Sequence, residues 1–86
     1  MSGKEIVRLG REGRRDMILR TAVTMAEREC LEIVTHGTVA RRCPVPTSAQ
    51  TVRHYFATKI EIWQAVLTRT GSPKVHEEAA RLMGDA

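Results

Sequence analysis

The chain has 86 residues, which is the length of one small domain with a limited core. Its six Gly and three Pro are too few for a fibrous or low-complexity protein. Helix-forming residues dominate, and no run alternates Val, Ile and aromatic residues as a strand does. We therefore expect an all-α fold of four to five helices, either as a single domain or as part of an oligomer whose interface adds to the core.

The charge of the chain favours an anionic partner. The formal net charge is +4 and the isoelectric point is near 9.7. The charge is uneven, because the stretch from Ile33 to Ile60 contains no Asp or Glu. Its basic and imidazole side chains are Arg41, Arg42, Arg53, Lys59, His36 and His54. Such a local excess is typical of a phosphate-binding face, and a solvated basic surface is the alternative interpretation.

The sequence gives no indication of a secreted or membrane protein, a disulfide framework, a metal site or an enzyme. The chain shows no cleavable apolar leader and no apolar run near ~18 residues, so we expect a cytoplasmic, nucleoid-associated protein with no membrane partner. Cys30 and Cys43 are too few for a disulfide framework and are expected to be reduced thiols. Because no CxxC or HxxxH pair is present, we expect no metal and no cofactor, and a domain this small offers little pocket for an enzyme.

Residues 1–13 predict a basic amino-terminal arm. Basic residues outnumber acids in it, and three glycines loosen its backbone. Two interpretations stay open, a frayed terminus and an arm that contacts DNA. In the second, the contacting residues are Arg8 and Arg11 together with Arg14 and Arg15 just beyond the arm.

Apolar residues at helical spacing predict five helices after the arm, over about 14–30, 35 to 42 or 43, 49–57, 59–70 and 72–83. Hydroxyl residues that can cap four of them are Thr35, Ser48, Thr58 and Ser72. Pro44 ends the second helix, because proline disfavours the helical region for the residue before it. The chain then divides into the arm, a DNA-binding domain over 14–70, and a last amphipathic helix within 72–84. We expect that helix to be either a lid on the core or a dimer contact.

The second and third helices predict a helix-turn-helix, whose second helix lies in the major groove of DNA. Val52 and Phe56 are four residues apart and face the core, which leaves their neighbours free to face DNA. We expect base contacts from Gln50, Arg53 and His54, with Arg53 able to contact guanine bidentately. The expected phosphate contacts are Thr35, His36, Ser48, Thr51, Tyr55 and Lys59.

A wider pattern includes these residues. Its members are Ile18, Leu19, Ala22, Val34, Thr35, Val39, Ala40, Ser48, Thr51, Val52, Tyr55, Phe56, Lys59, Ile62 and Val66. On them, the stretch from Ile18 to Leu67, roughly 50 of the 86 residues, resembles the DNA-binding region of tetracycline-repressor (TetR) family regulators. The resemblance implies a homeodomain-like helix-turn-helix bundle, with Thr51, Tyr55 and Lys59 on phosphate.

The chain departs from that family at four points. Cys30 stands where the family has Gly, and Arg53 stands where it commonly has Tyr. The turn is two residues longer, with Pro44 in place of its Gly. The chain ends about twenty residues after the motif, so we expect no ligand-sensing half and no small-molecule effector.

We expect a small transcriptional repressor that occupies an operator in double-stranded DNA. A homodimer or cooperative oligomer is expected, because helix-turn-helix proteins usually need two half-sites. The alternative is a helical protein–protein interaction module that modulates another regulator through the last helix and Trp63. Trp63 is also explained by packing against the first helix. RNA is less favoured, because no sheet that could stack bases is predicted.

Overall fold

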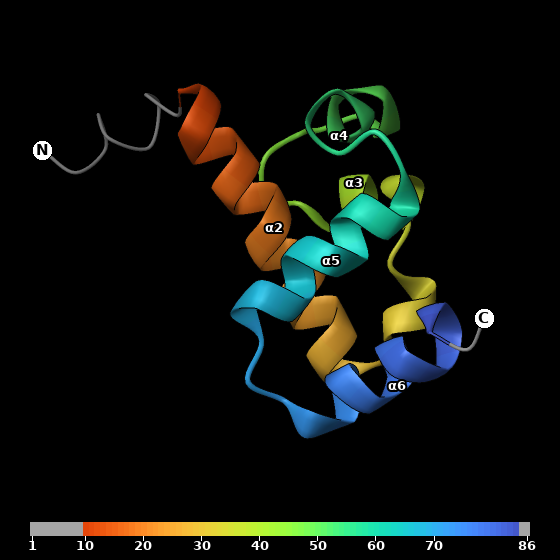
Figure 1. Ribbon diagram of the computed structural model, residues 1–86. Helices are drawn as coiled ribbons and strands as arrows, with labels where there is room; N and C mark the ends of the chain where they lie inside the picture. Colours follow the sequence, from red (N-terminus) through yellow and green to blue (C-terminus); the bar gives the residue numbers. More distant parts are fainter. Residues whose placement is uncertain (1–9, 85–86) are drawn as a thin grey trace, which may run out of the picture.

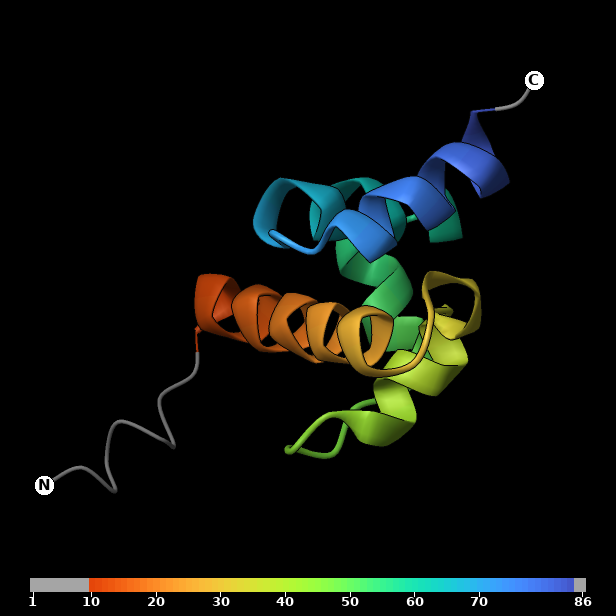
Figure 2. The same ribbon diagram turned by 90° about the horizontal axis from the view of Figure 1, so that it is seen from below.

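The computed structural model describes residues 10–84, which form an all-helical bundle of five α-helices and one short 3₁₀-helix. The elements are α2 (Arg11–Arg28), η1 (Leu31–Ile33), α3 (His36–Arg42), α4 (Ala49–Tyr55), α5 (Lys59–Arg69) and α6 (Pro73–Met83). Figure 1 shows α4 near the start of α2 at one end of the bundle, and α6 at the other end. Figure 2 shows α2 lying between α3 on one side and α5 and α6 on the other. The all-helical class expected from composition is confirmed.

The helix starts follow the capping residues closely. Backbone N–H groups donate to the hydroxyls of Thr35, Ser48, Thr58 and Ser72 over 3.3, 3.1, 3.2 and 3.4 Å. α2 is the exception, since it begins at Arg11, three residues before the expected start, and takes 11–13 from the predicted arm. Its first turn contains Glu12, whose charge suits the positive end of a helix. Gly13 within that turn costs at most about 1 kcal/mol relative to alanine, which is too little to prevent the helix.

The ends of the helices were predicted less well than their starts. α2 ends at Arg28 rather than Cys30, and α4 ends at Tyr55 rather than Ala57. Phe56 leaves the helical region with φ −133° and ψ 101°, which turns its ring into the core. The inward position predicted for Phe56 is therefore found, but at the residue after the helix rather than within it.

The core contains apolar side chains from every element. Its members are Ile18, Leu19, Ala22, Met25, Ala26, Leu31, Val34, Val39, Ala40, Val52, Phe56, Ile62, Trp63, Val66, Val75 and Ala79. Trp63 is only 4% exposed, and its Nε1–H donates to the carbonyl of Val34 over 2.9 Å. The core interpretation of Trp63 is therefore confirmed.

α6 packs on this core within a single chain. Val75 and Ala79 are buried on its inner face, and Glu78 is buried beside them. Lys74 donates from Nζ to the carbonyl of Glu29 at the end of α2, over 3.1 Å. α6 therefore covers part of the core within one chain, and a dimer contact through its outer face stays a prediction. Within residues 10–84, no helix is both long enough and apolar enough to span a bilayer.

Candidate nucleic-acid interface

α4 presents a polar face to solvent because its opposite face is anchored in the core. Val52 is fully buried and Phe56 is 2% exposed. The three residues expected to contact bases, Gln50, Arg53 and His54, are all exposed. The inward and outward faces of α4 are therefore those that the four-residue spacing of the apolar pair predicts.

The beginning of α4 is fixed by hydroxyl groups. Ser48 Oγ accepts from the backbone N–H of Thr51 and lies 3.0 Å from Thr51 Oγ1. Thr51 and Tyr55 are half-buried, one turn apart on the same flank of the helix. The ring of Tyr55 meets that of His54 edge to face, with centroids 5.5 Å apart. Three of the expected phosphate contacts, Ser48, Thr51 and Tyr55, thus belong to one ordered flank.

A hollow lies between the start of α2 and this flank of α4, and we term it the α2–α4 hollow. Its lining residues are Arg14, Ser48, Gln50, Thr51, His54 and Tyr55. Each of these side chains can donate a hydrogen bond, and none of them is an acid. The structure therefore brings Arg14, which the sequence grouped with the arm, against the helix that is expected to contact DNA.

Arg15 is held on the same end of the molecule by an aromatic ring. Its guanidinium carbon lies 4.8 Å from the centroid of Phe56, within the range of a cation–π contact. The carbonyl of Phe56 lies 2.8 Å from Nε2 of His36. Because a carbonyl oxygen only accepts, Nε2 carries the proton. His36, expected on phosphate, thus uses one ring nitrogen to join α3 to the end of α4.

Lys59 is the first residue of α5 and its side chain is exposed. Its ammonium lies 5.0 Å from the ring centroid of Trp63, one turn further along the same helix. Glu61 accepts from the N–H of Ala57 over 3.0 Å and places an acid near this lysine. The Thr58-x-x-Glu61 spacing is that of a capping box, but Glu61 accepts from the N–H of Ala57 rather than from that of the cap residue Thr58.

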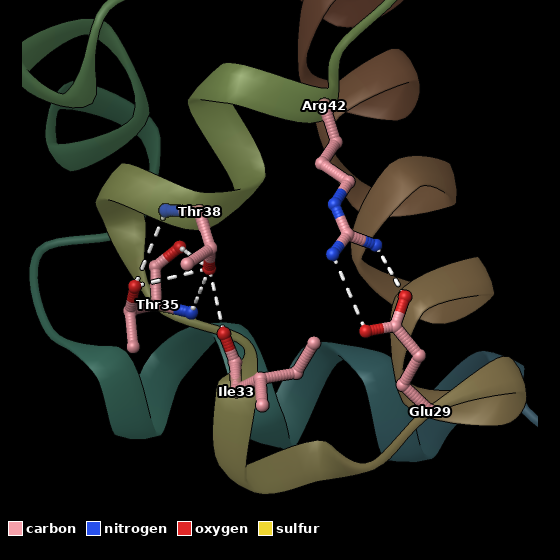
Figure 3. Close-up of polar contacts among 5 residues, drawn as sticks. All are labelled: Glu29, Ile33, Thr35, Thr38 and Arg42. Carbon is pink, nitrogen blue, oxygen red and sulfur yellow. Dashed lines mark hydrogen bonds and ion pairs between the residues drawn. The ribbon is translucent and has the colours of Figure 1, made fainter.

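Two residues of the acid-free segment 33–60, Thr35 and Arg42, bond to other residues of the fold. Thr35 and Thr38 form a reciprocal capping box, and Thr38 Oγ1 also donates to the carbonyl of Ile33 over 2.6 Å (Figure 3). The hydroxyl of Thr35, expected on phosphate, is therefore engaged in the cap. Arg42 forms a two-bond ion pair with Glu29, as Figure 3 shows. The hydrogen bond from Arg42 lowers the pKa of Glu29, and the same bond raises the pKa of Arg42.

Asp16 forms a second ion-pair cluster on α2. It contacts Arg20 over 3.2 Å and is hydrogen-bonded by Arg69 of α5, which lowers the pKa of its carboxyl. Within residues 10–84, the ion pairs use Arg20, Arg42 and Arg69. Arg14, Arg15, Arg53 and Lys59 form no ion pair in that part of the chain.

Two of the four possible arm contacts are not placed. Arg8 lies outside the described residues, and Arg11 is described only as the first backbone position of α2. Comparisons of the chain with family models, curated proteins and solved structures found no match. The resemblance to the TetR family therefore remains an expectation based on the residues that carry it.

Proposed function

We propose that the protein binds double-stranded DNA through α4, as the second helix of a helix-turn-helix, and that it recognises sequence. The observation that carries the proposal is the exposed face of α4, with Gln50, Arg53 and His54 opposite a firmly buried Val52. A helix that is anchored on one face and polar on the other can enter the major groove without losing core contacts.

Electrostatics support an anionic partner at this end of the bundle. Arg14 and Arg15 from α2, Arg53 from α4 and Lys59 from α5 have no carboxylate partner among residues 10–84. Those of the four that bind phosphates release counterions from the DNA backbone, and each phosphate contact adds about −0.9 to the slope of log K against log salt. Binding is therefore expected to weaken steeply as salt is raised.

Recognition of sequence is assigned to the outer face of α4. The guanidinium of Arg53 is planar and matches O6 and N7 of guanine, and the amide of Gln50 can make the equivalent contact with adenine. A good bidentate contact discriminates between bases by about 1–3 kcal/mol. Arg53 is therefore the residue on which sequence preference most depends.

The biological role that fits is a small transcriptional repressor that blocks an operator. The TetR-like pattern of residues supports this role, as does the helix-turn-helix order of α3 and α4. The proposed active form is a homodimer or cooperative oligomer, because two half-sites give the affinity that one short helix does not supply. Contact between copies would use the outer face of α6, since the inner face is buried.

The rival function, a protein-interaction module, has less support. It assigns the binding surface to Trp63 and the apolar face of the last helix. Trp63, Val75 and Ala79 are 4% exposed or less, so that surface is inside the molecule. Leu82 is the large apolar side chain of α6 that is exposed, at 36%, and one exposed leucine is ordinary.

Selection of bound sites from a pool of random-sequence duplexes tests the proposed function. We expect one sequence to be enriched over successive rounds, and footprinting of that site to give protection at low salt that weakens at higher salt. Recovery of unenriched DNA, together with a stable complex with a protein partner, would favour the interaction module.

A further inference from the structure

The α2–α4 hollow has the composition of a phosphate site rather than of an apolar pocket. Its six lining residues supply one guanidinium, three hydroxyls, an amide and an imidazole. No acid or aliphatic side chain is among them. Two acids of α2 are each two residues away from Arg14. Glu12 is exposed and does not line the hollow, and Asp16 is engaged by Arg20 and Arg69 and lines a different groove, beside Pro44 and Val45.

Arg14 is the only member of the hollow that is not supplied by α4 or its cap. Its side chain is half-buried, and it has no carboxylate partner among the described residues. Its guanidinium is therefore available to donate hydrogen bonds to an anion. Thr51 and Tyr55 line the same hollow, and their hydroxyls can donate to the same anion.

Arg53 does not line this hollow. It is two residues from Thr51 and two from Tyr55, and two residues span about 200° around a helix. Arg53 therefore lies on the other flank of α4, with Gln50 and His54 on the outermost face between the two flanks. In a major groove the two flanks of such a helix face different strands of the duplex.

We propose that the α2–α4 hollow binds one backbone phosphate of a single DNA strand, with Arg14 as its cation and Thr51 and Tyr55 as its hydroxyl donors. This inference rests on the proposed DNA binding and adds to it a defined contact that reads no sequence. The contact sets the depth and orientation of α4 in the groove, because α2 and α4 grip the same phosphate from two sides. Arg14 is thus a phosphate-binding residue of the folded domain rather than part of an arm.

The test measures the salt dependence of binding to one short duplex, over about 50–200 mM salt, for the full chain and its variants. Arg14→Gln should reduce the slope of log K against log salt by about 0.9, because one phosphate contact is lost. Arg28→Gln is the matched control, since Arg28 is an exposed arginine at the opposite end of α2. It should leave the slope unchanged. Thermal unfolding of both variants verifies that the fold is retained.

A second pair of variants tests whether Arg14 and Tyr55 act on one phosphate. Tyr55→Phe keeps the ring and removes the hydroxyl, so affinity should fall about two- to tenfold with no change of slope. In the Arg14→Gln background the same change should have a much smaller effect, because the phosphate is no longer held.

Additive losses of affinity, or an Arg14→Gln slope equal to that of Arg28→Gln, would overturn the proposed phosphate site while leaving DNA binding intact. A wild-type chain with no measurable affinity for duplex DNA would instead overturn the proposed function, and the phosphate site with it.

Discussion

The carboxylate of Glu78 in α6 accepts a 2.7 Å hydrogen bond from the backbone N–H of Leu31, 47 residues earlier in the chain. Its second oxygen lies 3.3 Å from the N–H of Glu32. Cys30, which precedes η1, provides no side-chain cap, so Glu78 satisfies the free N–H groups at the start of that short helix. α6 thereby holds the segment that leads into α3.

Replacing Glu78 by alanine should destabilise the fold. The change leaves a buried N–H of Leu31 without a partner, at a cost of about 1–3 kcal/mol in the free energy of unfolding. Glu78→Gln keeps an acceptor oxygen and should cost less. Urea unfolding measures both, with Glu77→Ala, an exposed neighbour on the same helix, as the control. If Glu78→Ala and Glu77→Ala had equal unfolding midpoints, the proposed capping role of Glu78 would be wrong.

The comparison of Glu78 with Thr35 shows what the sequence could predict. Thr35, Ser48, Thr58 and Ser72 cap helices that begin one residue later, and such local contacts follow from residue type and spacing. Glu78 acts on a segment far away in sequence, and nothing near it indicates that role. Its spacing from Val75 and Leu82 places it on the apolar face of α6, but the N–H groups that it meets there follow only from the fold.

For the candidate nucleic-acid interface too, local spacing predicted one part and the fold determined the rest. The inward pair Val52 and Phe56 fixed the exposed face of α4, because a helix has a regular period. The proximity of Arg14 to Tyr55 and the stacking of Arg15 on Phe56 depend on how α2 crosses α4, which local spacing does not determine. The pairing of Arg42 with Glu29 also follows only from the fold. Because Glu29 lies outside the acid-free segment 33–60, counting the positive charges of that segment gives too many for DNA to contact.

Lys59→Ala should weaken binding to all DNA sequences alike. If Lys59 contacts phosphate, the slope of log K against log salt falls by about 0.9. Its stacking on Trp63 gives a different expectation, because loss of an exposed cation–π contact lowers stability by about 0.5–1 kcal/mol without altering the slope. Salt titrations and urea unfolding of the same variant separate the two roles. An unchanged slope would remove Lys59 from the phosphate contacts.

Acidification should destabilise the protein through Asp16 and Glu29. Their pKa values are lowered from 3.8 and 4.5 by hydrogen bonds from Arg69 and Arg42. An acid with a lowered pKa stabilises the fold above its unfolded pKa, and this contribution is lost as the pH falls through the folded value. Stability should therefore decline below about pH 5, and the decline should be modest because both ion pairs are exposed. Urea midpoints of wild type and Asp16→Asn measure this, and identical pH profiles would contradict the role of Asp16.

The central claim is that α4 reads DNA sequence through Arg53. Parallel site selections from one random duplex pool, with wild type, Arg53→Ala and Arg28→Ala, test it most directly. We predict that wild type and Arg28→Ala enrich the same site, and that Arg53→Ala loses about 1–3 kcal/mol of preference at one base pair of that site. An Arg53→Ala protein that enriched the wild-type site with undiminished preference at every base pair would show that Arg53 does not read the sequence.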